Sequence, residues 1–264
     1  MHLSDEHQAQ LVDAKRRLES TGLAIKATNL LGKPIEKGFE LLPADWRIRI
    51  GNATREALMV AMKGAALTMG ARPTEASPRW HKIAATLSGA AGGAFGLPAL
   101  IVELPVSTTI MCRSIADIAR ANGESLASVE TRLACLEVFA LGGASKSDDA
   151  AETGYFTVRA GLAQAVSEAA QYLATHAVAQ EGAPALVRLV AMIASRFQIQ
   201  VSEKAAAQAV PVIGAAGGAL INLLFIDHFQ DMSRGHFTLR RLERQYGADE
   251  VRRAYEEAGM RAEG

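Results

Sequence analysis

The chain has few of the residues and motifs on which common enzyme chemistry depends. Its only two cysteines, Cys112 and Cys135, form no CxxC pair, which excludes the common thiol-redox signature and predicts reduced structural thiols. HExxH, GxSxG and Walker-loop motifs are missing as well, and with them the signatures of metalloproteases, serine hydrolases and P-loop proteins. The sequence therefore identifies no reaction, and we expect neither a cofactor nor a bound metal.

The chain also has no net charge. The 28 Lys and Arg residues balance 28 Asp and Glu residues, so nucleic acid is not an expected partner. The N-terminus has no apolar segment followed by a small-residue cleavage site, which predicts no secretory signal and a cytoplasmic location. Residues 47–82 nevertheless carry seven basic residues against Glu56 and Glu75. This excess is typical of the cytoplasmic flank of a membrane segment, and equally of a solvated helix face.

Helical periodicity dominates the rest of the sequence. The clearest case spans 126–140, where apolar residues recur at helical spacing before Gly142 and Gly143 end the pattern. The other predicted helices cover 4–21, 51–69, 148–180, 184–210, 239–246 and 248–260. Hydrophobic residues make up 49% of the chain, enough for a core. We expect an all-α fold, a compact multi-helix bundle with two Gly/Ala-rich hydrophobic helices at its centre.

The breaks between these helices are short, and none is long enough to be a flexible interdomain linker. We expect one compact body over 79–264, with an N-terminal helical arm over 1–78 packed on it.

The hexapeptide GAAGGA occurs twice, at 89–94 and at 214–219, within the uncharged stretches 83–102 and 205–226. Both stretches are long enough to span a bilayer but only marginally hydrophobic. Small residues four apart would let another backbone approach closely, as in a glycine zipper. The predicted helix-packing or membrane-contact residues are Gly89, Gly92, Gly93, Gly96, Gly214, Gly217 and Gly218. Two helices buried in a water-soluble core remain an alternative to membrane contact.

Pro98 and Pro105 bracket an apolar segment that contains Glu103. Because proline removes a helix hydrogen bond, we expect a break or a re-entrant hairpin here, with Glu103 at the bend. A carboxylate in this apolar environment needs a donor, for which Arg113 is a candidate, or a raised pKa. An exposed position at the hairpin tip is the alternative.

Two further polar clusters have more than one interpretation. Residues 227–236 offer Asp227, His228, Asp231 and His236 as metal ligands, or as a capped, solvated helix end that stops at Gly235. Residues 145–152 offer Asp149 and other acids for catalysis, or an N-cap followed by acids in the first helical turn.

Several segments together resemble the EcsC protein family of bacteria. They are LPVSTTIMCRSIADIARANGE, LACLEVFALGGASKSDDAAETGYFTVRA, VPVIGAAGGALINLLFIDHFQDMSRGHFTLRRLERQYG and VRRAYEE, within a resemblance from about residue 45 to the C-terminus. The resemblance implies an α-helical cytoplasmic or membrane-associated protein and supplies no catalytic residues. Its recognisable positions are Pro105, Arg113, Glu137, Tyr155, Arg159, Pro211, Gly214, Gly218, Asn222, Leu242 and Glu243.

Together these features favour a non-enzymatic, membrane-associated accessory protein, linked to transport or envelope processes, whose partner is a membrane surface or a membrane protein. One alternative is an uncharacterised hydrolase with a polar cleft, and another is a soluble protein–protein adaptor. The candidate functional polar residues are Glu103, Arg113, Glu137, Asp149, Tyr155, Arg159, Asn222 and His228. If these residues converge in one pocket, the hydrolase gains support. If they are scattered over separate helix faces, it loses support.

Overall fold

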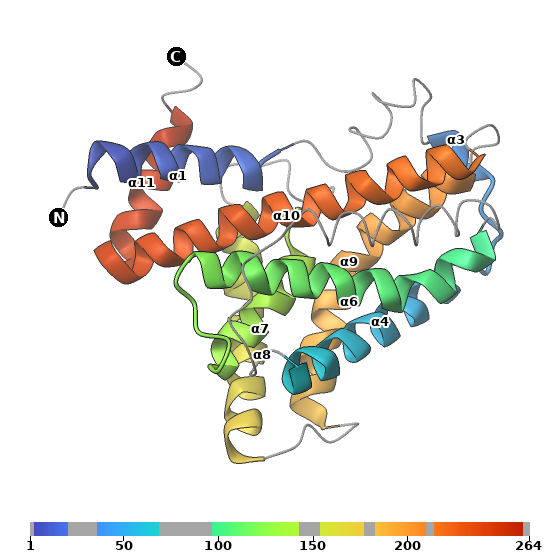
Figure 1. Ribbon diagram of the computed structural model, residues 1–264, viewed down its shortest axis with the longest axis horizontal. Coiled ribbons are helices and arrows are strands. Elements are labelled where there is room, and N and C mark those ends of the chain that lie inside the picture. Colours follow the sequence, from blue (N-terminus) through green and yellow to red (C-terminus); the bar gives the residue numbers. More distant parts are fainter. Residues whose placement is uncertain are drawn as a thin grey trace.

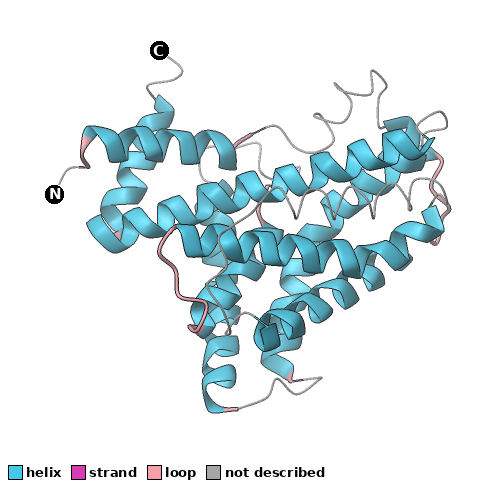
Figure 2. Cartoon of the chain, in the orientation of Figure 1, coloured by secondary structure: helices cyan, strands magenta, loops and turns pink. Residues whose placement is uncertain are grey.

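A computed structural model describes residues 3–20, 36–68, 97–142, 154–176, 183–209 and 214–260. In these ranges every regular element is helical, which confirms the all-α prediction (Figures 1 and 2). The elements are α1 (Asp5–Leu18), α3 (Glu36–Glu40), α4 (Trp46–Thr68), α6 (Leu97–Ala121), α7 (Val129–Glu137), the 3-10 turn η1 (Val138–Ala140), α8 (Gly154–Thr175), α9 (Pro184–Ala209), α10 (Gly214–Tyr246) and α11 (Ala248–Met260).

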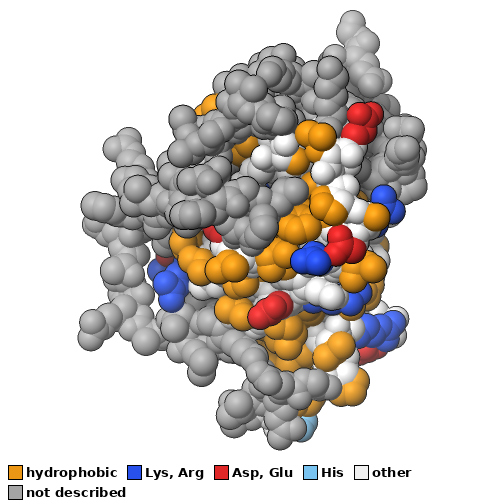
Figure 3. Space-filling view, turned by 90° about the vertical axis from the view of Figure 1, so that its right-hand side faces the viewer, with side chains coloured by type: hydrophobic (Ala, Val, Ile, Leu, Met, Phe, Trp, Pro, Cys, Tyr) orange, Lys and Arg blue, Asp and Glu red, His pale blue; other side chains and the backbone are white. Residues whose placement is uncertain are grey.

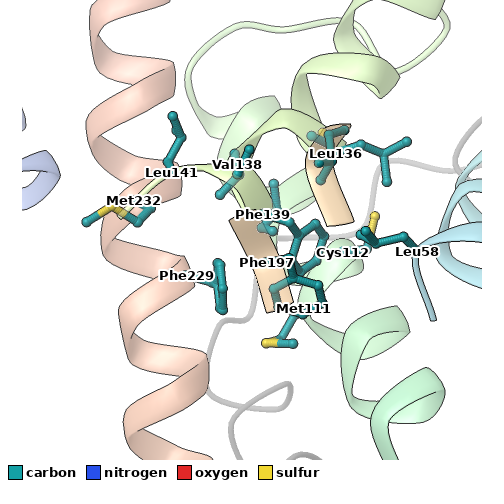
Figure 4. Close-up of a cluster of buried hydrophobic side chains, with 14 of the residues drawn as sticks. Leu58, Met111, Cys112, Leu136, Val138, Phe139, Leu141, Phe197, Phe229 and Met232 are labelled. Atoms are coloured by element: carbon teal, nitrogen blue, oxygen red, sulfur yellow. The ribbon is translucent and has the colours of Figure 1, made fainter. Parts of the chain in front are cut away.

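The long helix α10 runs along the body and organises its neighbours (Figure 1). It packs against α1, α6, α9 and α11, while α4 packs on α6 and α9, and α8 packs on α7 and α9. Phe139 of η1, Phe197 of α9 and Phe229 of α10 meet in the core (Figure 4). The ring centroid of Phe139 lies 4.9 Å from that of Phe197 and 5.2 Å from that of Phe229, a favourable aromatic spacing. The bundle is therefore centred where α9, α10 and η1 meet.

Most helices lie where the periodicity predicts them. The Ser4 side chain caps α1 by accepting a hydrogen bond from the His7 N–H, and acids follow in the first turn. Gly142 (φ 72°) follows η1 and Gly247 (φ 89°) follows α10, in the left-handed conformation that commonly ends a helix.

The expected break around Pro105 is wrong, because α6 runs without interruption from Leu97 to Ala121. Pro98 lies in the first turn, where a missing N–H leaves no intrahelical bond unmade. At Pro105 the cost of an interior proline, about 3 kcal/mol, is offset by the burial of one face of α6, including Leu104 and Ile115. Packing against α4 and α10 therefore overrides the local signal, and Glu103 does not lie at a bend.

The expected end of a helix at Gly235 is also wrong, because α10 continues to Tyr246. A Cβ atom at Gly235 would lie 2.6 Å from Leu18 Cγ and 3.0 Å from the Ala14 carbonyl oxygen. Gly235 therefore permits the close approach of α1 rather than terminating α10.

The Gly/Ala-rich stretch 205–226 is divided between the end of α9 and the start of α10. Gly214, Gly217 and Gly218 fall in the first turns of α10, at the right-hand end of the body in Figure 1. The first copy of the hexapeptide, with Gly89, Gly92, Gly93 and Gly96, lies outside the described residues. The glycine zipper and the domain boundary at residue 78 therefore stay predictions.

Candidate functional site

A polar cleft of about 740 Å³ lies among α7, α8, α10 and α11. Helix α8 supplies a wall of small apolar side chains, Ala160, Ala163, Val166 and Ala170. The polar side chains that line the cleft are Glu130, Glu137, Arg159, Ser167, Gln171, Arg240, Glu243, Asp249 and Arg252. The cleft therefore combines an alanine-rich surface with many ionisable groups.

Arg159 is fixed by two partners. Its Nη1 and Nη2 donate to the two carboxylate oxygens of Glu243 at 2.6 and 3.1 Å, a bidentate ion pair. Nη1 also donates to the Tyr155 hydroxyl oxygen at 3.2 Å. Tyr155 and Arg159 are four residues apart on α8, so they share one face of the helix.

The hydrogen bonds continue from Tyr155 into the core. Its hydroxyl lies 3.0 Å from Nδ1 of buried His236. Because that oxygen already accepts from Arg159, the simplest pattern has the hydroxyl donate to Nδ1, so that Nε2 carries the ring proton. Nε2 then faces Glu137 Oε2 at 4.0 Å, too far for a hydrogen bond.

Burial controls the protonation of these groups. It lowers the pKa of His236 well below its ordinary value, with Arg159 and Arg240 acting in the same direction, so the ring is neutral. Burial also raises the pKa of Glu137, although Arg159 and Arg240 oppose the shift. The pKa of the Tyr155 phenol is raised by burial too, so the phenol keeps its proton.

The cleft brings together some, but not all, of the sequence candidates. Glu137 and Arg159 line it, and Tyr155 is bonded to Arg159 just behind them. Arg113 is exposed on α6, and His228 is buried on α10 without lining the cleft. Asp149 lies outside the described residues.

Other contacts of the cleft were missed by the sequence reasoning. Arg240 Nε donates to Glu124 Oε1 at 2.9 Å, and Arg244 binds the same oxygen. Glu124 lies in the α6–α7 connection, 116 residues from Arg240, so no local pattern predicts their contact.

The residues 227–236 do not form the cluster that a metal site needs. Asp231 Oδ1 instead accepts from Arg17 Nη1 at 2.7 Å, which ties α10 to α1. Among the described residues, no three His, Cys, Asp or Glu side chains converge as metal ligands.

A second polar cluster lies apart from the cleft, and contains Glu103 and Asn222. The fully buried Lys204 Nζ donates to Glu103 Oε1 at 3.0 Å and to Asn222 Oδ1 at 2.7 Å. It also lies 4.8 Å from the centroid of the Phe225 ring, and burial lowers its pKa. The donor to Glu103 is therefore Lys204, and the prediction of Arg113 as a candidate donor is wrong.

The end of the body that contains this cluster also exposes large apolar side chains. We call it the apolar end, formed by α3, the start of α4, the start of α6, the end of α9 and the start of α10 (Figure 1). Its exposed apolar residues are Phe39, Leu41, Ile48, Val102 and Val106, with Ile48 69% and Val102 77% exposed. Figure 3 shows this end face-on, with hydrophobic side chains gathered over its described surface.

A hollow of about 860 Å³ opens between the α3–α4 connection and α9. Phe39, Leu42 and Ile48 line it, together with Ile199 and the exposed Arg47. The apolar surface therefore continues into a groove whose lining carries one basic and one acidic group, Arg47 and Glu203.

Within the described residues, one helix, α9, is long and apolar enough to cross a membrane, although a core helix passes the same test. It is not one of the uncharged stretches expected from the sequence, and 44% of its apolar window is buried in the protein.

The model of the EcsC protein family matches residues 7–242. The match begins in α1, well before the position near residue 45 expected from the sequence, and it ends before α11. No curated protein and no solved structure matches the chain. Because the family match covers most of the 264 residues, the chain belongs to the EcsC protein family.

Proposed function

We propose that this protein is a non-enzymatic accessory protein that binds the membrane surface through its apolar end. The observation that carries the proposal is that five large apolar side chains are exposed on the elements of that end, namely Phe39, Leu41, Ile48, Val102 and Val106. Exposing apolar side chains to water is unfavourable in free energy, and a patch of them is typical of a surface that contacts a membrane or another protein. The exposed Arg47 beside it supplies a charge that anionic lipid headgroups would attract.

The buried contacts of α9 favour binding at the membrane surface over insertion of α9 into the bilayer. The charged Lys204 lies within α9 and holds Glu103 of α6 and Asn222 of α10. Moving α9 into lipid would separate these partners and leave charged groups in hydrocarbon, which costs several kcal/mol. We therefore assign α9 to the protein core and the membrane contact to the exposed side chains.

Vesicle flotation tests this function. The purified protein should float with vesicles of phosphatidylcholine and phosphatidylglycerol, and less with phosphatidylcholine alone. Ile48→Glu combined with Val102→Glu should weaken binding roughly tenfold or more, because two charges would enter the contact surface. Val12→Glu is the matched control, since Val12 is an exposed valine on α1, away from the apolar end.

Equal flotation of the double variant and the control would show that the apolar end is not the membrane contact. If all of the wild-type protein stays in the fraction that contains no vesicles, the protein does not bind membranes and the proposed function is wrong.

A hydrolase is the second candidate function, supported by the convergence of Glu137, Arg159 and Glu243 in one cleft. Paired carboxylates can act as acid and base when their environments differ, as those of buried Glu137 and ion-paired Glu243 do. A screen of glycoside and ester substrates tests it. Activity that Glu137→Gln abolishes would favour the hydrolase over the accessory protein.

A further inference from the structure

Among the charged residues that line the polar cleft, the arginines have partners in the protein and several of the acids do not. Each of its three arginines has a carboxylate partner: Arg159 binds Glu243, Arg240 binds Glu124, and Arg252 Nε donates to Glu256 Oε1 at 3.0 Å. Three carboxyl groups of the lining, those of Glu130, Glu137 and Asp249, have no hydrogen bond or close ion pair within the described part of the chain. The surplus of the cleft is therefore acidic, although arginines contribute to its walls.

Glu137 is the acid that an ordinary solvated surface does not explain. It is only 8% exposed, yet it lines the cleft. Its Oε2 atom lies 4.0 Å from His236 Nε2, and that nitrogen is itself buried without a hydrogen-bond partner. A largely buried carboxyl group that makes no hydrogen bond to the protein and lines a cleft is available to a ligand there.

The remaining surfaces of the cleft restrict the kind of ligand. Glu130 and Asp249 are exposed, and would attract a cation before it reaches Glu137. The α8 wall of Ala160, Ala163, Val166 and Ala170 offers no hydrogen bonds from its side chains and suits a short alkyl chain. A cationic head and an aliphatic body are together the features of an aliphatic amine.

We propose that this cleft binds a small aliphatic amine or diamine, whose ammonium group pairs with the Glu137 carboxylate while its alkyl chain lies along α8. The rim acids Glu130 and Asp249 receive the second ammonium group of a diamine. Each arginine of the lining is paired with a carboxylate, which weakens its repulsion of the ligand without abolishing it. This site is separate from the apolar end, so it adds to the proposed membrane function rather than depending on it.

Isothermal titration calorimetry with 1,4-diaminobutane tests the proposal, with 1,4-butanediol as the uncharged ligand of similar length. The wild-type protein should bind the diamine and not the diol. Glu137→Gln should weaken diamine binding roughly tenfold or more, since it removes a charge-assisted hydrogen bond. Glu56→Gln, which changes an exposed carboxylate on α4, should leave the affinity unchanged.

Thermal melting of both variants shows whether each is folded, and Glu130→Gln with Asp249→Asn supplies a second variant that leaves the buried carboxyl in place. This rim variant should bind the diamine more weakly than the wild-type protein does, and its affinity for 1-aminobutane should fall less. The proposal is overturned if the diamine fails to bind the wild-type protein, if the diol binds equally well, or if Glu137→Gln binds the diamine like wild type. The variant with Ile48→Glu and Val102→Glu should still bind the diamine, so a failure of membrane binding and a failure of amine binding can be told apart.

Discussion

Two buried polar clusters contact α10, and they differ in how completely their charges are matched. Near the start of α10, the fully buried Lys204 reaches both Glu103 and Asn222 and joins three helices. Near its end, Arg159 and Glu243 form a complete pair, but the neighbouring Glu137 is left facing a cleft.

The comparison separates a structural role from a binding role. A buried ion pair with good geometry fixes how helices meet, even when it adds little net stability. A buried acid without a partner does neither, and it is retained at a cost to stability where a function needs it. We therefore assign the Lys204 cluster to the architecture of α6, α9 and α10, and the Glu137 cluster to ligand binding.

Breaking the Lys204 cluster should have the largest effect. Lys204→Met leaves the Glu103 carboxylate buried without its cation, so the free energy of unfolding should fall by about 3–5 kcal/mol. Denaturant unfolding monitored by circular dichroism measures it. Arg49→Met is the control, because it removes an exposed ion pair to Asp45 and should cost less than about 1 kcal/mol.

Replacing both charges gives a sharper result. Lys204→Met combined with Glu103→Leu removes the uncompensated charge and should recover most of the lost stability. If Lys204→Met alone is as stable as wild type, the cluster does not hold the three helices together.

At the other end of α10, Tyr155→Phe should have an intermediate effect. It removes the hydroxyl shared by Arg159 and His236, and leaves the buried Nδ1 of His236 without a partner. The free energy of unfolding should fall by about 1–3 kcal/mol. Tyr246→Phe is the matched control, since it removes another tyrosine–histidine hydrogen bond, 2.7 Å to His7 Nδ1, at a part-buried position.

The Tyr246→Phe loss should be smaller, because water can replace the missing partner there. Equal losses in the two variants would mean that the Tyr155 hydroxyl is not sealed from solvent, and would weaken the contrast between the two clusters.

The helices were predictable because their signals are local. Periodicity places α1, α4, α8, α9 and α11 close to their observed positions. The two errors, at Pro105 and Gly235, have one physical cause. Both residues disfavour a helix when only their neighbours in sequence are considered, and both are held in one by contacts with helices that lie far away in the chain.

The candidate site was predictable only in part, for the same reason. Glu137, Tyr155 and Arg159 were identified as polar residues, but the residues that they face or bind, His236 and Glu243, belong to α10. Lys204 is a charged residue beside the alanine run 205–207, and no local pattern indicates that its side chain is buried. Partners that are 80 or more residues apart are specified by helix packing, and no local spacing encodes them.

The smallest expected effect, and the most specific, comes from Glu137→Gln. Because burial raises the pKa of Glu137 above its ordinary value of 4.5, the folded state binds this proton more tightly than the unfolded state. The resulting stabilisation is fully present below pH 4.5 and is lost as pH rises through the raised pKa. Glutamine carries no such charge, so at neutral pH the variant should be more stable than wild type by about 1 kcal/mol.

Thermal and urea unfolding of both proteins between pH 4 and pH 8 measures this difference, which should grow with pH and then level off. Glu56→Gln, on the exposed face of α4, should show no such trend. Added 1,4-diaminobutane should stabilise the wild-type protein and not Glu137→Gln, because a ligand stabilises only the folded form that binds it. A difference that shrinks as pH rises would mean that the ionised carboxylate is already paired, and the contrast with Lys204 would then disappear.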